Sequence, residues 1–133
     1  MRKVLGSTPV LVVSDIHRAA DFYVRVLGYQ EPAFYGQPPR FAMMHRDEHD
    51  LMLELPRGDG RVQPHGAFDV WDLHLRVADL DAEKRAIEAA GWKCGDVETT
   101  EYDMREIIVF DPDGHRICLG QDLATRPEDS GKL

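Results

Sequence analysis

The side chains best suited to chemistry in this chain alternate along one short segment. Asp72, His74 and Arg76 are each separated by a single leucine, and a period of two is typical of a β-strand with one apolar face. If the apolar face covers a helix, the three polar residues share the opposite face, with Asp72 and His74 about 7 Å apart. A carboxylate and an imidazole so placed could bind a divalent metal ion or move a proton, although a strand histidine more often hydrogen-bonds a neighbouring carboxylate.

Glu54 lies near the end of another apolar segment and has two interpretations. Its carboxylate could act as a general base, or it could accept a hydrogen bond from the amine or hydroxyl of a ligand. Alternatively it forms an ion pair with Arg76 or Arg105, which would fix the shape of a cleft without taking part in chemistry. The sequence leaves both interpretations open.

Two cysteines, Cys94 and Cys118, are too few for a disulfide framework and are expected to be free thiols. Cys118 could be a nucleophile only if a basic neighbour such as Arg116 or His74 lowered the pKa of its thiol. A small, half-buried residue that lines a ligand site is the simpler interpretation. Free thiols favour a reducing compartment and no signal peptide is visible, so we expect a cytoplasmic protein.

The elements that must position these residues occur twice. A strand-like segment is followed by Val13-Ser14-Asp15-Ile16 in the first half and by Val77-Ala78-Asp79-Leu80 in the second, and each of these motifs opens an amphipathic run. The aspartate in each motif is a suitable N-cap, because its carboxylate accepts a free backbone N–H at the helix start. Each run stops at a glycine, Gly28 or Gly91, that can adopt the left-handed conformation of a helix end. The spacing predicts two equivalent helices.

Three further strand-like segments follow each predicted helix, separated by turn sequences such as residues 36–39 and 111–114. A polar, glycine-rich joint at residues 57–66 connects the two halves. Each half is therefore predicted to contain one strand, one helix and three strands. Because one half is too small to bury a core alone, the two must pack together, and the seam between them is a natural ligand site.

In this order the motifs resemble the vicinal oxygen chelate superfamily, which includes glyoxalase I, bleomycin-resistance proteins, fosfomycin-resistance proteins and extradiol dioxygenases. The resemblance is carried by residues 9–16, Asp21-Phe22-Tyr23, Leu27-Gly28-Tyr29 and the hairpin at residues 110–117. It implies an α+β fold of paired βαβββ modules, whose curved mixed sheets form a cup with the helices on the convex side. Residues 1–121 would form one domain, with module one at about 7–57 and module two at about 69–121, followed by a polar tail at 122–133.

Metal-dependent members of the superfamily bind the ion with four side chains, two from each module. The resemblance places these positions at Thr8, Glu54, Asp72 and Cys118, of which only Glu54 is of the usual type. A threonine hydroxyl is a poor ligand for Zn²⁺, Ni²⁺ or Mn²⁺, and one thiolate among carboxylates suits neither a hard nor a soft metal. We therefore expect no metal and no other cofactor. A divalent metal, if bound, would use Glu54, His74 and Asp72, with Cys118 as a fourth member.

The resemblance implies two alternative functions. The first, which we favour, is a non-catalytic protein of the bleomycin-resistance type, which binds a small molecule in the inter-module cup and forms a homodimer. The alternative is a metal-dependent lyase or isomerase of the glyoxalase I type, or a thiol transferase of the fosfomycin-resistance type. An extradiol dioxygenase is disfavoured, because a second well-placed histidine for its iron is lacking. The candidate catalytic residue is Glu54, and the candidate ligand-binding residues are Glu54, Asp72, His74, Arg76, Arg105 and Cys118.

The formal net charge of −8 argues against two classes of partner. A nucleic-acid-binding surface must be positive, and anionic membranes repel an acidic protein. No apolar run long enough to span a membrane is visible. A small molecule is therefore the expected partner besides a second copy of the chain.

Apolar and aromatic side chains provide a pool from which a cup could be lined, and such surfaces suit a flat or amphipathic ligand. Trp71 is expected in the core because it alternates with Leu73, and His115 is expected to be solvated in a hairpin turn. The pool consists of Phe34, Tyr35, Phe41, Met43, Met44, Met52, Trp71 and Tyr102.

Overall fold

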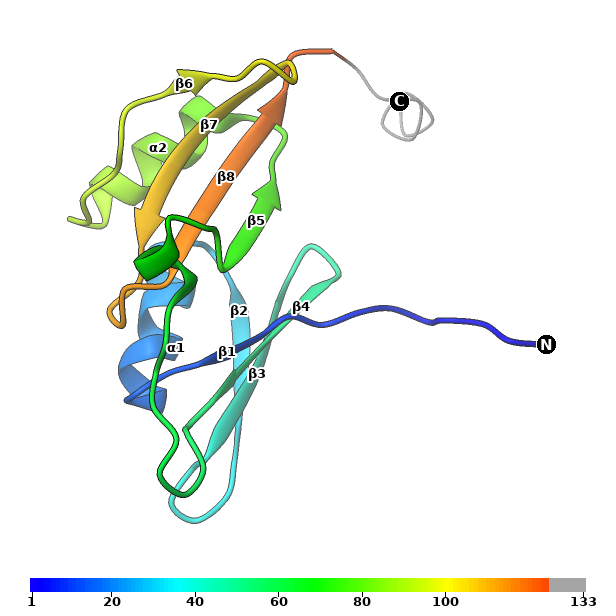
Figure 1. Cartoon of the computed structure of the whole chain (residues 1–133), viewed down its shortest axis with the longest axis vertical. Coiled ribbons are helices and arrows are strands. Elements are labelled where there is room, and N and C mark those ends of the chain that lie inside the picture. Colours follow the sequence, from blue (N-terminus) through cyan, green and yellow to red (C-terminus); the bar gives the residue numbers. More distant parts are fainter. Residues whose placement is uncertain (125–133) are drawn as a thin grey trace.

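Residues 1–124 are described by a computed structural model and fold into two modules that lie end to end (Figure 1). Module one comprises β1 (Val10–Val12), α1 (Ile16–Arg25), β2 (Gln30–Tyr35), β3 (Phe41–Arg46) and β4 (His49–Glu54). Module two comprises β5 (Leu73–Arg76), α2 (Leu80–Ala89), β6 (Glu98–Thr99), β7 (Met104–Phe110) and β8 (Arg116–Asp122). A 3₁₀ helix, η1 (His65–Phe68), lies between the modules. The predicted order of elements is confirmed in both halves, and the predicted tail lies outside the described residues from position 125 onwards.

Both helices begin and end where the sequence predicts. The Asp15 carboxylate accepts a hydrogen bond from the Arg18 N–H at 3.0 Å, and the Asp79 carboxylate accepts one from the Ala82 N–H at 3.1 Å. The two glycines that follow the helices, at positions 28 and 91, have φ values of 77° and 79°, which a residue without a side chain adopts at little cost. Among residues 1–124, neither helix is long and apolar enough to cross a membrane.

Each module forms its own four-stranded mixed sheet. The strand order is β1-β4-β3-β2 in module one and β5-β8-β7-β6 in module two. The first strand of each module runs parallel to the last one, and the other pairs are antiparallel. Within the described range, no strand of one sheet pairs with a strand of the other. The predicted α+β class, with two mixed sheets and two helices, is confirmed.

One face of each sheet is buried beneath its own helix. In Figure 1 both helices lie to the left of their sheets. Because strand side chains alternate, the intervening residues point to the opposite face of each sheet, which its helix does not cover. The helix-side residues, all buried, are Leu11, Ala42, Met44, Leu51 and Leu53 in module one and Leu73, Ile107, Val109, Ile117 and Leu119 in module two.

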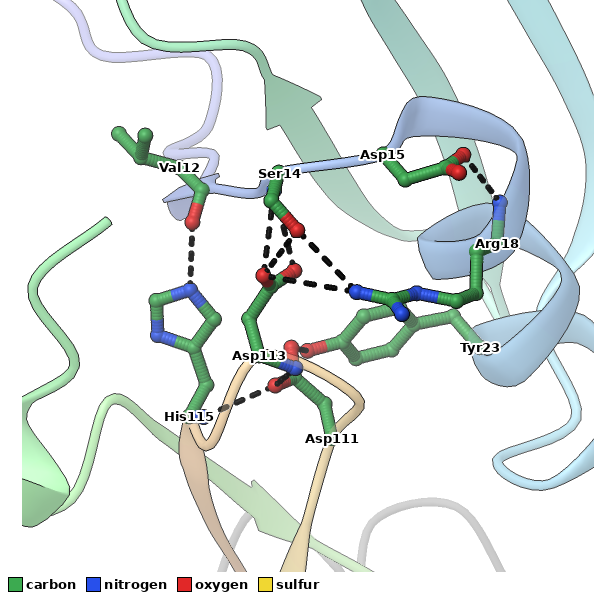
Figure 2. Close-up of polar contacts among 8 residues, drawn as sticks. All are labelled: Val12, Ser14, Asp15, Arg18, Tyr23, Asp111, Asp113 and His115. Carbon is green, nitrogen blue, oxygen red and sulfur yellow. Dashed lines mark hydrogen bonds and ion pairs between the residues drawn. The ribbon is translucent and has the colours of Figure 1, made fainter. Parts of the chain in front are cut away.

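The hairpin between β7 and β8 of module two forms hydrogen bonds with module one (Figure 2). The Tyr23 hydroxyl of α1 donates a buried hydrogen bond of 2.7 Å to Asp111 Oδ2. His115 Nε2, at the other end of the turn, donates to the Val12 carbonyl oxygen at 2.6 Å. The turn of module two is therefore held against both β1 and α1 of module one.

Asp111 also sets the shape of this turn. Its Oδ1 atom accepts the backbone N–H groups of Asp113 and His115, at 2.9 and 2.8 Å. The Ser14 hydroxyl of module one donates to Asp113 Oδ1 at 2.5 Å. The sequence-based expectation of a solvated His115 is wrong: the residue is only 3% exposed, because the turn is folded against the other module.

A second contact between the modules comes from the hairpin between β3 and β4. Arg46 donates two hydrogen bonds to the Glu83 carboxylate of α2, at 2.9 and 2.6 Å, and one to the Leu27 carbonyl oxygen at 2.9 Å. Asp47 and Glu48 in the turn both have positive φ, which a two-residue hairpin requires. The hairpin of each module therefore contacts a helix of the other.

We predict that Tyr23→Phe lowers the free energy of unfolding by about 1–3 kcal/mol, because it leaves a buried carboxylate oxygen of Asp111 without its donor. Urea unfolding monitored by circular dichroism measures this change. Tyr35→Phe is the matched control, because the Tyr35 side chain is partly exposed. Equal stabilities of the two variants would contradict the structural role assigned to the Tyr23 hydroxyl.

Candidate functional site

The uncovered face of sheet β1-β4-β3-β2 is apolar and aromatic. Strand pairing places Tyr35 beside Phe41, Phe41 beside Glu54 and Met43 beside Met52. The Tyr35 and Phe41 rings are stacked, with centroids 4.7 Å apart and an interplanar angle of 14°. Tyr35 remains 47% exposed. We call these five residues, Tyr35, Phe41, Met43, Met52 and Glu54, the module-one face.

Glu54 is the only carboxylate among these five residues. Its Oε1 atom accepts hydrogen bonds of 3.0 and 2.8 Å from Arg57, a residue whose side chain is largely exposed. The two partners considered from the sequence are engaged elsewhere: Arg76 contacts Asp122 at 3.3 Å, and Arg105 contacts Asp81 at 3.1 Å. The Glu54 carboxylate is therefore held by an exposed and displaceable arginine.

The uncovered face of sheet β5-β8-β7-β6 carries a polar cluster. His74 and Cys118 are directly opposite on β5 and β8, and Glu106 projects from β7 onto the same face. His74 Nε2 lies 3.2 Å from Glu106 Oε2, and the Tyr102 hydroxyl donates to Glu106 Oε1 at 2.7 Å. The Trp71 ring packs on His74 at 4.8 Å. We call His74, Glu106 and Cys118 the module-two cluster.

Burial, together with the neighbouring Glu106 carboxylate, raises the pKa of the Cys118 thiol to about 12. The thiol is thus protonated at neutral pH, and the condition set for a nucleophilic cysteine, a lowered pKa, is not met. The core position expected for Trp71 is also wrong. Trp71 is 38% exposed, because it precedes the first residue of β5 and does not follow the alternation of that strand.

Asp72 has a different role from its strand neighbours. Its carboxylate accepts backbone N–H bonds from His65 at 2.9 Å and from Arg116 at 2.8 Å, and it lies 3.2 Å from His115 Nδ1. Although burial opposes the charged form, the backbone hydrogen bonds from His65 and Arg116, together with the adjacent His115 ring, lower the pKa of Asp72. The carboxylate thus joins the inter-module segment to the β7–β8 hairpin.

The candidate site residues named from the sequence are only partly brought together. His74, Arg76 and Cys118 share the uncovered face of module two, whereas Arg105 points to the helix side, towards Asp81. Glu54 belongs to the other sheet. Their roles in ligand binding stay predictions.

The four positions implied for a standard metal site do not fit a metal ion. The carboxylate oxygens of Asp72 are taken by backbone N–H groups, and Glu54 is paired with Arg57. Thr8 contributes only a hydroxyl, and it precedes β1.

Sequence reasoning missed Glu106, which is buried on the uncovered face of module two. A signal for it exists. Glu106 alternates with Ile108 along β7, and the hairpin at residues 111–114 fixes the register that places Ile108 opposite Cys118. Alternation combined with hairpin register would have placed Glu106 with His74 and Cys118.

Residues 7–119 match the family model described as Glyoxalase/Bleomycin resistance protein/Dioxygenase superfamily. The match spans most of the chain, and the chain belongs to this family. The superfamily identified from the helix-end and hairpin motifs is thereby confirmed.

Several relatives of known name are similar to this chain. The anthracycline biosynthesis protein DauV of Streptomyces sp. strain C5 is 29% identical over 115 residues, which cover 75% of this chain and 40% of DauV. The solved structure of TnmS3, an antibiotic binding protein from Streptomyces sp. CB03234, has a TM-score of 0.72 at 27% identity, with 92% of this chain and 98% of TnmS3 covered. A bleomycin-binding protein from Streptomyces verticillus, solved with copper(II)-bleomycin, shares the fold with a TM-score of 0.67 at 24% identity, over 94% of this chain and all of that one.

His115 provides a prediction for the pH dependence of stability. Burial would lower its pKa, but the Val12 carbonyl, Asp111 and Asp72 favour the imidazolium, and the pKa is raised above the ordinary value of 6.5. The resulting stabilisation is fully present below the unfolded-state pKa and is lost as the pH rises through the folded-state pKa. We expect the free energy of unfolding to fall as the pH rises above about 6.5, and to fall less in His115→Gln.

The matched control is His49→Gln, because His49 is exposed at the start of β4. This variant should keep the pH slope of the unchanged protein in urea unfolding. If the unfolding free energy changed with pH equally in all three proteins, the pKa of His115 would not differ between the folded and unfolded states.

Proposed function

We propose that this protein binds a flat or amphipathic small molecule on the module-one face, without catalysis and without the standard metal site of its family. The observation that carries this proposal is the stacked Tyr35–Phe41 pair, which remains open to solvent beside Met43 and Met52. Aromatic and thioether side chains favour planar apolar ligands through stacking and dispersion contacts. Glu54, at the edge of this surface, would accept a hydrogen bond from an amine or hydroxyl of the ligand.

The relatives support an antibiotic as the class of ligand. TnmS3 is an antibiotic binding protein, and its alignment covers nearly the whole of both chains. DauV is an anthracycline biosynthesis protein, although this chain spans only 40% of its length. A planar, polycyclic antibiotic would match the stacked rings.

A second copy of the chain is the proposed protein partner. The two uncovered sheet faces lie on separate sheets, and each is open on one side. The module-two face of one copy, placed opposite the module-one face of the other, would form a closed cup and bring Arg76 and His74 to the ligand. The cytoplasm is the proposed location, because both cysteines are free thiols.

Tyr35→Ala should weaken the binding of an anthracycline about 2- to 13-fold, because the ligand loses one stacking partner, worth about 0.5–1.5 kcal/mol. Quenching of ligand fluorescence measures the affinity. The matched control is Phe34→Ala, because Phe34 is the preceding residue on β2 and packs on His17 of α1, on the opposite side of the sheet. An affinity reduced more by Phe34→Ala, or no binding of any planar antibiotic by the unchanged protein, would refute the proposed surface.

Glu54→Ala should reduce the affinity for the same ligand while changing the unfolding free energy by less than about 1 kcal/mol, since within the described residues the carboxylate forms its ion pair with the exposed Arg57 side chain. Arg57→Ala is the companion variant: it frees the carboxylate without removing it and should leave the affinity equal or higher. A large loss of thermal stability with unchanged affinity in Glu54→Ala would make Glu54 a structural residue.

A further inference from the structure

The module-two cluster brings three kinds of metal ligand together from three adjacent strands. The ligand atoms of His74, Glu106 and Cys118 all lie within 4.8 Å of one another. Cys118 is fully buried, Glu106 is nearly so, and His74 is partly exposed. An imidazole, a carboxylate and a thiol thus converge at one point that opens on the uncovered face of the sheet.

Neighbouring residues hold two of the three donors in position. The Tyr102 hydroxyl bonds one oxygen of Glu106 and leaves the other, Oε2, directed at His74. Trp71 packs on the His74 ring and limits its rotation. Partners of this kind, bonded to a ligand rather than to the ion, orient the ligands in metal sites.

Glycine at position 120 leaves room beside the imidazole. A Cβ atom there would lie 3.2 Å from His74 Nε2 and 2.7 Å from the terminal methyl of Met104. Any side chain at this position would therefore crowd the nitrogen that faces Glu106. Glycine at this position therefore keeps a side chain of residue 120 away from the converging donors.

We propose that His74 Nε2, the Glu106 carboxylate and the Cys118 thiolate bind one Zn²⁺ ion, with the fourth position open to water or a ligand atom on the uncovered face. Zinc accepts nitrogen, oxygen and sulfur donors in tetrahedral geometry. Tetrahedral donors lie roughly 3.5 Å apart. The longest separation in the cluster, at most 4.8 Å, must therefore shorten by no more than about 1.3 Å, whereas His74 Nε2 and Glu106 Oε2, at 3.2 Å, are already close enough. On binding, the thiol proton passes to solvent, the Nε2 proton of His74 is given up and the neutral ring carries its hydrogen on Nδ1, and the ion replaces the direct contact between His74 and Glu106.

This set differs from the one implied by the family resemblance. It lies within a single module and shares only Cys118 with the positions Thr8, Glu54, Asp72 and Cys118. It therefore requires no second copy of the chain and no contribution from the module-one face. Zinc binding and antibiotic binding can each fail without the other.

The test uses the full chain, freed of metal with a chelator and titrated with Zn²⁺ alone by calorimetry. We expect one ion per chain. Cys118→Ser should weaken binding by more than about 100-fold, and Tyr102→Phe, which removes the hydroxyl that orients Glu106, by about 10-fold. Cys94→Ser is the matched control and should bind as the unchanged protein does.

Cobalt provides a second readout that does not depend on the folding of a core variant. The chain has two cysteines, so Cys118 is the sole thiol in Cys94→Ser. Co²⁺ added to this variant should produce a thiolate-to-cobalt charge-transfer band in the near ultraviolet. Absence of the band, absence of stoichiometric zinc, or zinc binding that survives Cys118→Ser would overturn the proposal and leave the cluster as a hydrogen-bonded network only.

Discussion

The docking of the β7–β8 hairpin onto module one is the constraint on which the rest of the structure depends. Tyr23, Asp111 and His115 are buried polar residues, and a buried polar atom without a partner is costly. The hairpin is therefore held in the position in which the Tyr23 hydroxyl, the Asp111 carboxylate and His115 Nε2 find their hydrogen-bond partners. That position, together with the Arg46–Glu83 contact, places the two modules end to end with a helix on the same side of each sheet.

The two uncovered sheet faces have the same backbone plan but different chemistry. In module one the face presents stacked rings and thioethers, which interact through dispersion and contain no proton donor except the tyrosine hydroxyl. In module two the corresponding face presents an imidazole, a carboxylate and a thiol joined by short contacts. The same scaffold thus carries an apolar, aromatic surface in one module and a polar surface in the other.

The elements governed by local interactions could be predicted from the sequence, and those governed by distant partners could not. The N-caps Asp15 and Asp79 act on backbone groups three residues away, so the sequence places both helices correctly. His115 bonds to Val12, 103 positions earlier, and no local pattern reveals such a partner. Arg105 and Glu106 are adjacent, and only the strand register shows that one faces the helix and the other the cluster. The domain limits and site roles derived from the sequence stay predictions.

The contacts between the modules are reciprocal: the β7–β8 hairpin contacts α1 at Tyr23, and the β3–β4 hairpin contacts α2 at Glu83. The interface between the two modules of one chain thus resembles the interface of a two-fold symmetric dimer, in which each partner offers the same elements to the other. Such an interface forms equally well between modules of one chain and modules of two chains. The segment between β4 and β5 therefore decides the covalent connectivity of the assembly. If this segment were too short to connect two modules in contact, module one of one chain would instead pack against module two of another chain. The side-chain contacts between the modules would be the same in both arrangements.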